Sequence, residues 1–350
     1  MKTMIVLFLL LGFTSAFAAD IKFGAFIDTY YAYDSNLPRN NERAFITQPE
    51  RHNEPGFNLV HGDVQYSGEK VHGRLAVQGG NSVEKNTKGG PDERNFARYV
   101  QESYVGVKLG DGTWIDAGIF LGNIGMESWI SKDNWTYTRS LFLDYVPYYS
   151  SGVRLSHQLS TSESFQLQVL NGWQNINETN DSKAIGLQYQ RPLSEKVTFT
   201  YNNFLGDERI VSKSDRFRGY HNFILKWLSS ESWNFLGGID FGHQAQQKNS
   251  GIDAWAATSL TARQILSSVQ SLAYRLEYYL DPHQSNIVTG TKNGFNVVSA
   301  SMNYDQQVLK NLLWRTEVRG FFSKDEIYPD GERSKNRWDG LFVTSLSWWI

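Results

Sequence analysis

Alternation of side-chain character is clearest in Leu272-Ala273-Tyr274-Arg275-Leu276-Glu277-Tyr278-Tyr279-Leu280. Every second residue from Leu272 to Leu280 is leucine or tyrosine, and the residues between them include Arg275 and Glu277. Because successive side chains of a β-strand point to opposite faces, this period of two predicts a strand with one apolar face and one largely polar face. The same pattern recurs in the segments 184–190, 217–227 and 312–322.

About sixteen such strands are expected along the chain, joined alternately by short turns such as 110–112 and long loops such as 36–56. All eight prolines are expected in these connections. An even strand number with this alternation predicts an all-β fold, a transmembrane antiparallel up-and-down β-barrel. The expected strands are 21–35, 57–67, 70–79, 96–109, 113–121, 148–160, 163–173, 182–191, 196–207, 215–228, 232–244, 252–265, 269–281, 293–304, 312–323 and 338–349.

Aromatic residues are abundant for so polar a chain: 11 Trp, 18 Tyr and 21 Phe occur in 350 residues of which only 40% are hydrophobic. They gather at both ends of the expected strands, which is typical of the two aromatic girdles of a membrane barrel, whereas a soluble core would hold them in mid-strand. The girdle residues expected at the turn side are Trp114, Phe165, Trp227, Trp233, Trp314 and Trp348, and those at the loop side are Tyr31, Tyr33, Trp173, Tyr278, Phe295, Phe322 and Trp338.

The first residues predict export. Lys2, the apolar run 4–11 and the ending Ala16-Phe17-Ala18 form a secretory signal peptide over 1–18, followed by the barrel over 19–350 with long extracellular loops. A single membrane helix is the alternative, disfavoured by the short apolar run. Export and the predicted fold indicate the bacterial outer membrane, with its lipid, lipopolysaccharide and the barrel-assembly machinery as partners.

Composition excludes several kinds of chemistry. The absence of cysteine removes disulfide scaffolds, thiolate metal sites and thiol nucleophiles. With 34 basic against 36 acidic residues, the chain has no electrostatic signature of a nucleic-acid partner. No motif indicates a cofactor or a metal, and we expect neither.

Three short motifs carry a family resemblance. They are Gly24-Ala25-Phe26-Ile27-Asp28-Thr29-Tyr30-Tyr31-Ala32-Tyr33, then Gly118-Ile119-Phe120-Leu121-Gly122 with Gly125-Met126-Glu127, and Asn171-Gly172-Trp173 followed by Asn180-Asp181-Ser182-Lys183. In this order they resemble the putative β-barrel porin-2 family of bacterial outer-membrane proteins. The resemblance implies a porin-like barrel and brings no catalytic residues. The final strand also resembles the assembly signal of such barrels, with Ile350 in place of the usual Phe.

Closing about sixteen strands leaves an interior too wide for side chains to fill, so a water-filled channel is expected. Acidic residues predominate in the first strands and basic ones in the last, which would set a transverse field across the pore; alternatively, these charges pair across strands. The expected lumen wall includes Asp28, His61, Asp63, Arg74, Asp116, Arg263, Arg275, Glu277, Arg315, Glu317 and Arg319.

The loop 122–147 is the longest and is rich in rings and charges, so we expect it to fold into the lumen and constrict the pore. Its candidate constriction residues are Glu127, Lys132, Asp133, Arg139 and Asp144.

Three functions remain open at this stage. The first is a porin, not an enzyme, that passes small hydrophilic solutes and ions by diffusion; a homotrimer is expected only by likeness to other porins. The second is a non-conducting outer-membrane barrel with a structural, adhesion or surface-binding role. The third is a barrel enzyme or a soluble β-rich envelope protein: His61 and Asp63, with Asp28 on the adjoining strand, could supply a general base, but no nucleophile accompanies them. His157 and Ser156 are adjacent and therefore face opposite ways.

Overall fold

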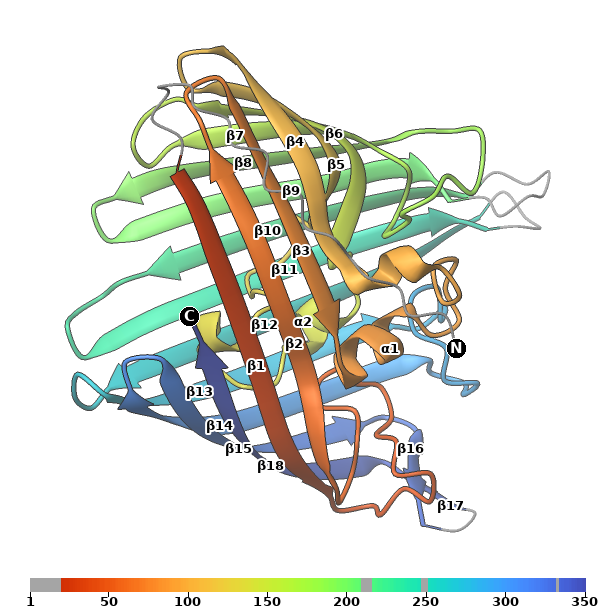
Figure 1. Ribbon diagram of the computed structural model, residues 1–350. Helices are drawn as coiled ribbons and strands as arrows, with labels where there is room; N and C mark the ends of the chain where they lie inside the picture. Colours follow the sequence, from red (N-terminus) through yellow and green to blue (C-terminus); the bar gives the residue numbers. More distant parts are fainter. Residues whose placement is uncertain (1–19, 209–215, 247–250, 332–333) are drawn as a thin grey trace, which may run out of the picture.

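The computed structural model describes residues 20–208, 216–246, 251–331 and 334–350; the predicted signal peptide lies outside them. Within these ranges sixteen strands form one closed antiparallel barrel, which confirms the predicted fold class (Figure 1). The strands are β1 (Asp20–Asp34), β2 (Pro55–Ser67), β3 (Val71–Gly79), β4 (Val100–Gly110), β5 (Thr113–Leu121), β6 (Tyr149–Gln158), β7 (Ser164–Leu170), β8 (Ala184–Ser194), β9 (Val197–Asp207), β10 (Phe217–Trp227), β11 (Trp233–Ala245), β12 (Ile252–Ile265), β13 (Gln270–Asp281), β14 (Phe295–Leu309), β15 (Leu312–Ser323) and β18 (Trp338–Trp349).

Closure is made by the first and last strands. β1 pairs with β18 from Phe26 opposite Trp349 to Asp34 opposite Leu341, and on its other side it pairs with β2. Each barrel strand therefore has a hydrogen-bonded neighbour on both sides, which leaves no open sheet edge. The short β16 (Tyr328–Asp330) and β17 (Ser334–Asn336) pair only with each other, outside the barrel.

Inner and outer faces alternate along the strands. On β13, Leu276 is 58% exposed on the outer face while Arg275 is 2% exposed on the inner face. The two kinds of connection separate to opposite ends of the barrel, which we name the turn end and the loop end (Figure 1). The turn end has short connections such as 68–70 and 195–196, and the loop end has long ones such as 35–54 and 282–294.

Short helices lie in the long connections. They are α1 (Asn81–Thr87), α2 (Leu141–Asp144) and the 3₁₀ turns Phe96–Tyr99 and Ser131–Asp133. None of the helices in the described part of the chain has the length and apolar character needed to cross a membrane. The segment 96–99 was expected to be strand; the side chain of Asn95 accepts a hydrogen bond from the backbone N–H of Ala97 and so begins a helical turn instead.

The expectation that all prolines lie in connections is wrong for two of them. Pro55 is the first residue of β2, and Pro192 lies in β8. Each occupies a place where a missing N–H is tolerated: a strand start, and a register shift between Pro192 and Ser194. Pro329 lies in β16, within the connection between β15 and β18.

Three of the expected girdle residues also lie elsewhere. Trp114 stacks on the inner-face His72 with ring centroids 4.1 Å apart, Phe295 is fully buried, and Trp173 lies in a loop with its ring against Phe204. Aromatic character alone does not say which face a ring takes at a strand end, because the alternation is interrupted at the turn or loop.

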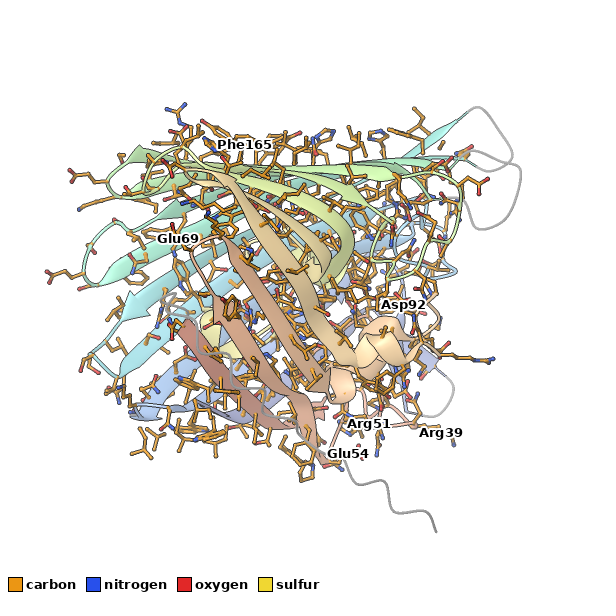
Figure 2. All side chains as sticks on the ribbon, turned by 45° about the horizontal axis from the view of Figure 1, so that its top comes forward. Arg39, Arg51, Glu54, Glu69, Asp92 and Phe165 are labelled. Carbon is orange, nitrogen blue, oxygen red and sulfur yellow. The ribbon has the colours of Figure 1, made fainter. Side chains whose placement is uncertain are left out.

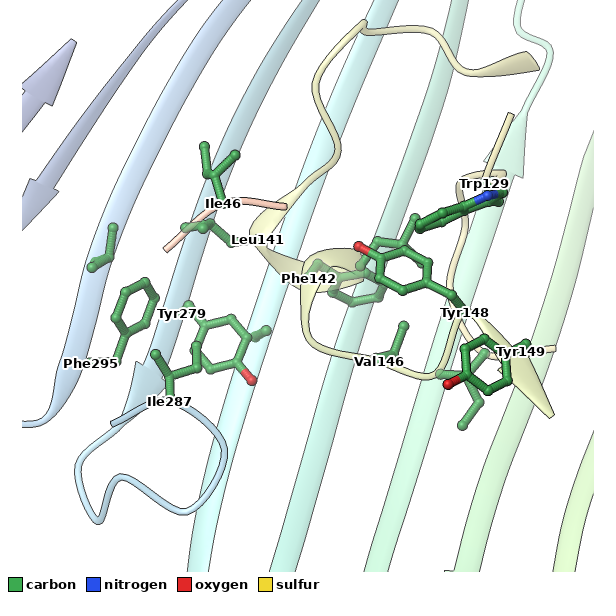
Figure 3. Packing of buried hydrophobic residues seen from close by; sticks show 14 of the residues in the cluster. Ile46, Trp129, Leu141, Phe142, Val146, Tyr148, Tyr149, Tyr279, Ile287 and Phe295 are labelled. Atoms are coloured by element: carbon green, nitrogen blue, oxygen red, sulfur yellow. The ribbon is translucent and has the colours of Figure 1, made fainter. Parts of the chain in front are cut away.

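An apolar core lies inside the barrel rather than between two layers. Figure 3 shows Leu141 and Phe142 of α2, with Tyr148, among rings and aliphatic side chains of the inner wall such as Tyr279 and Phe295. A wholly wet lumen would contain no such cluster, so the loop that carries α2 is packed as a folded element.

Candidate functional site

The loop 122–148 enters and leaves the barrel wall at one point. Gly122 donates its N–H to the carbonyl oxygen of Tyr148 at 2.9 Å. A Cβ on Gly122 would collide with the carbonyl oxygen of Pro147, so glycine is required where the two ends of the loop meet. The loop therefore leaves β5 and returns to β6 as a closed excursion into the lumen.

The excursion reaches strands on opposite sides of the barrel. The N–H of Gly125 donates to the side chain of Asn222 on β10 at 3.2 Å, and Ser131 donates to Asp28 on β1 at 2.8 Å. The indole of Trp129 donates to Gln78 of β3 at 2.8 Å. The loop thus crosses the interior, as the sequence predicted from its length and its rings.

A cluster of buried charges holds the middle of the loop to β13 and β15. The guanidinium of Arg275 contacts Glu127 at 3.3 Å, Glu277 at 3.2 Å and Glu317 at 3.1 Å, and Arg319 contacts Glu277 at 2.5 Å. All five side chains are at most 5% exposed. Because an unpaired buried charge costs about 3–5 kcal/mol, each member of this ion-pair cluster fixes the others.

The same carboxylates bind the loop backbone. Glu317 accepts hydrogen bonds from the N–H and the hydroxyl of Thr138, at 2.7 and 2.8 Å, and Glu277 accepts one from the N–H of Leu141 at 2.7 Å. Arg315 is held by Asp305 at 2.7 Å and donates to loop carbonyl oxygens at 2.6 and 2.7 Å. The inner-face charges of β13 to β15 therefore serve to seat the loop.

Three of the five loop charges expected to face the pore do not face open space. Glu127 belongs to the ion-pair cluster, Arg139 lies fully buried over the rings of Trp129 and Tyr148, and Asp144 accepts a hydrogen bond from Tyr148 at 2.8 Å. The sequence could not separate them from the exposed pair, because their burial depends on how the loop packs on itself and on distant residues such as Arg275, which pairs with Glu127, and Thr47, which donates to Asp144.

Lys132 and Asp133 are the two loop charges that keep contact with solvent. Their side chains are 25% and 49% exposed and lie 2.6 Å apart. They stand where the loop comes nearest to the turn end, beside the turn 266–269.

Charges on the first strands pair across neighbouring strands. Arg74 contacts Asp63 at 3.2 Å and Glu102 at 2.6 Å, and Asp116 contacts Arg154 at 2.9 Å. These contacts favour the alternative in which the wall charges neutralise one another across strands. They do not favour a transverse field across the pore.

The carboxylate–histidine group considered for catalysis is only partly assembled. His61 lies 3.3 Å from Asp63, whereas Asp28 accepts hydrogen bonds from Asn58, Ser131 and Ser347. In the described ranges no group of three or more His, Cys, Asp or Glu side chains is arranged to hold a metal ion.

Much of the inner wall is covered by the loop and the long connections. Each barrel strand contributes at least one buried inner-face residue; one per strand, in sequence order, these are Asp28, His61, Ala76, Glu102, Phe120, Ser150, Gln168, Gly186, Asn202, Asn222, Asp240, Ser259, Glu277, Ser301, Glu317 and Ser345. Inner-face residues nearer the turn end, such as Arg154, Gln190 and Thr200, are only half-buried. The interior is therefore less filled at the turn end of β6, β8 and β9, and we name this region the polar vestibule.

At the loop end, buried ion pairs hold the connection 35–54 against the barrel, and no pattern in the sequence indicates them. Arg43, in the connection 35–54, is fully buried and lies 3.1 Å from Asp34 and 3.4 Å from Asp339. An arginine in an aperiodic loop gives no sign of its burial, so only the fold reveals it. Figure 2 shows Arg39, Arg51 and Glu54 of the same connection at one margin of the molecule.

Comparison with known proteins gives one family match. The family model described as putative beta-barrel porin-2, OmpL-like, matches residues 20–347, nearly the whole chain. A search of curated proteins finds no match.

Solved structures share the architecture at low sequence identity. An anion-selective porin from Comamonas acidovorans superposes with a TM-score of 0.63 at 8% identity, covering 95% of this chain and 100% of that one. The outer membrane channel DcaP of Acinetobacter baumannii gives 0.62 at 12% identity, with 97% and 100% covered. A trimer form of OmpT, an outer membrane protein of Vibrio cholerae, gives 0.61 at 10% identity, with 95% and 100% covered. At these identities the likeness establishes the barrel fold.

Proposed function

Because the chain belongs to the putative beta-barrel porin-2, OmpL-like family, we propose that it is a porin through which small hydrophilic solutes and ions diffuse passively. The observation that carries the proposal is the seated loop: 122–148 crosses a lumen whose wall is polar, and buried charges hold it there. A polar wall can form hydrogen bonds with hydrated solutes, and a loop fixed in the lumen narrows the channel without a conformational change. No catalytic role is proposed.

The constriction of this channel is the loop itself. Its exposed charges, Lys132 and Asp133, would meet a passing solute, while Glu127, Arg139 and Asp144 keep the loop in place. Arg74, Asp116 and the other paired wall charges keep the vestibule wet rather than strongly selective.

The proposed setting is the bacterial outer membrane, with the turn end in the periplasm and the loop end outside. Exposed outer-face side chains such as Leu276 and Phe322 would meet lipid, and the loops would meet lipopolysaccharide. Insertion would need the barrel-assembly machinery. A homotrimer is proposed from likeness to the trimeric form of OmpT.

A second candidate is a non-conducting barrel with a structural, adhesion or surface-binding role. It is favoured by the burial of inner-face residues on every strand, which fits a lumen plugged by its loops. A polar vestibule confined to the turn end is compatible with either function.

Conductance of the purified mature protein in a planar lipid bilayer separates the two. The porin function predicts stable, stepwise conductance, and a reversal potential in a salt gradient then gives the ion preference. Protein that shows heat-modifiable gel migration, and so is folded, but produces no steps would contradict passive diffusion and support the plugged barrel.

A further inference from the structure

A cavity of about 330 Å³ lies inside the barrel at the turn end, beneath the loop 122–148. Residues 132–135 of the loop form one side, and the turn-end parts of β12 to β15 with the turn 266–269 form the others. Its volume is at the lower end of the range for small-molecule sites. Ser267 and Ser268 of the turn are exposed, so the cavity is open to solvent at the turn end.

Arg263 supplies the distinctive chemistry of this cavity. It lies on the inner face of β12, and its Nε donates to the hydroxyl of Ser271 at 3.2 Å. Within the described residues, neither of its terminal amino groups has a hydrogen bond or an ion pair, and neither is shut off from solvent. Both terminal amino groups of a residue that lines the cavity are therefore free to donate to a ligand.

The other charges of the cavity are already neutralised. Lys132 pairs with Asp133 at 2.6 Å, and Asp305 pairs with Arg315 at 2.7 Å. Among the described lining residues Arg263 is the one charge without an ion pair of its own; Asp305, which pairs with Arg315, attracts it from a greater distance. A ligand with one negative charge is therefore matched, whereas a second negative charge would meet the carboxylates of Asp133 and Asp305.

Arg263 and the polar residues of the cavity favour one kind of singly charged anion over others. A guanidinium fork fits the two oxygens of a carboxylate. The hydroxyls of Ser267 and Ser268 and the amide of Gln270 offer further hydrogen bonds to a ligand that carries hydroxyl groups.

We propose that this cavity is a binding subsite for a small hydroxylated monocarboxylate, whose carboxylate is held by Arg263. A role for the subsite in solute transport rests on the proposed diffusion function. Binding of the carboxylate itself does not require the protein to conduct. Occupancy would raise the local concentration of such solutes beside the loop.

Calorimetric titration of the mature protein in detergent micelles with sodium gluconate tests the subsite, with glucose as the neutral six-carbon control. We expect gluconate to bind with a dissociation constant of about 1–10 mM and glucose not to bind measurably. Arg263→Gln should weaken gluconate binding by about tenfold or more, because it removes the charge and the fork. Arg263→Lys, which keeps only the charge, should give an intermediate loss.

The matched control is Lys226→Gln, which removes one positive charge from an exposed turn-end position on β10, away from the cavity, and should leave binding within about twofold. Equal binding of gluconate by Arg263→Gln, equal binding of glucose, or tighter binding of inorganic phosphate would each overturn the proposal. Heat-modifiable gel migration verifies that each variant is folded. Conductance on the same preparations separates the two ideas: gluconate binding without conductance overturns only the diffusion function, and conductance without binding overturns only the subsite.

Discussion

Glu208 is a carboxylate that the structure places in an unusual environment. It follows β9 directly, at the loop end, and accepts a hydrogen bond from the N–H of Trp173 at 3.0 Å. Removal from water raises the pKa of Glu208 to about 7, and the nearby positive charge of Arg218 offsets only part of this effect. In the unfolded chain the same carboxyl has its ordinary pKa of 4.5.

This shift predicts a stability that falls as pH rises. Between pH 4.5 and 7 the folded state binds more protons than the unfolded state, so the stabilisation is complete below 4.5 and lost above 7. We expect the free energy of unfolding to drop by about 1–3 kcal/mol over this range relative to Glu208→Gln, a value reduced for the group's partial exposure. Urea titrations of both proteins in detergent at pH 5 and pH 8 measure it.

Glu231→Gln, which removes an exposed carboxylate in a turn, controls for the loss of one acid. If the free energies of unfolding of the wild type and of Glu208→Gln change by the same amount between pH 5 and pH 8, Glu208 does not titrate in this range.

The sequence predicts which face of a strand a side chain takes, but not which side chain it contacts. Alternation places Arg275 and Glu277 on the inner face, but the partners of Arg275 include Glu127, 148 positions away in the chain. Such a contact depends on strand register and on the path of the loop, neither of which has a local signal. The faces were predictable, and the ion-pair cluster was not.

Among the elements, the loop 122–148 shows what composition can and cannot predict. Its rings predicted burial, because a long aromatic loop in solvent would expose too much apolar surface. Which of its charges would also be buried depended on partners such as Thr47 and Tyr148, which hold Asp144. The position of Pro192 inside a strand was likewise not predictable, because it depends on the register shift in the pairing of β8 with β9.

Gly122 tests how tightly the two ends of this loop must meet. Gly122→Ala forces the new Cβ against the backbone of Pro147, so we expect a loss of about 1–3 kcal/mol in the free energy of unfolding. Gly79→Ala is the matched control, because a Cβ there meets nothing within 4 Å, and it should change stability by no more than about 0.5 kcal/mol. Urea titration followed by tryptophan fluorescence compares them, and equal effects would mean that the loop junction tolerates a side chain.

For the molecule as a whole, closure and the inward path of the loop 122–147 were predictable, and the contribution of the other long connections was not. Period-two strands, an even strand number and alternating connections led to the sixteen-stranded barrel that the described residues form. The expected lumen was a water-filled channel narrowed by this one loop, whereas connections such as 35–54 also bury side chains inside it. In the proposed porin function, passage would therefore be set by the loop more than by the barrel.

The role of the loop is measured by comparing the single-channel conductance of the wild type with that of a variant in which a short Gly-Ser linker replaces Trp129 to Arg139. The variant loses the loop segment bound to Asp28 and Glu317, so we expect its conductance to rise by at least about twofold, with heat-modifiable migration retained as proof of folding. A folded variant with the conductance of the wild type would contradict this expectation.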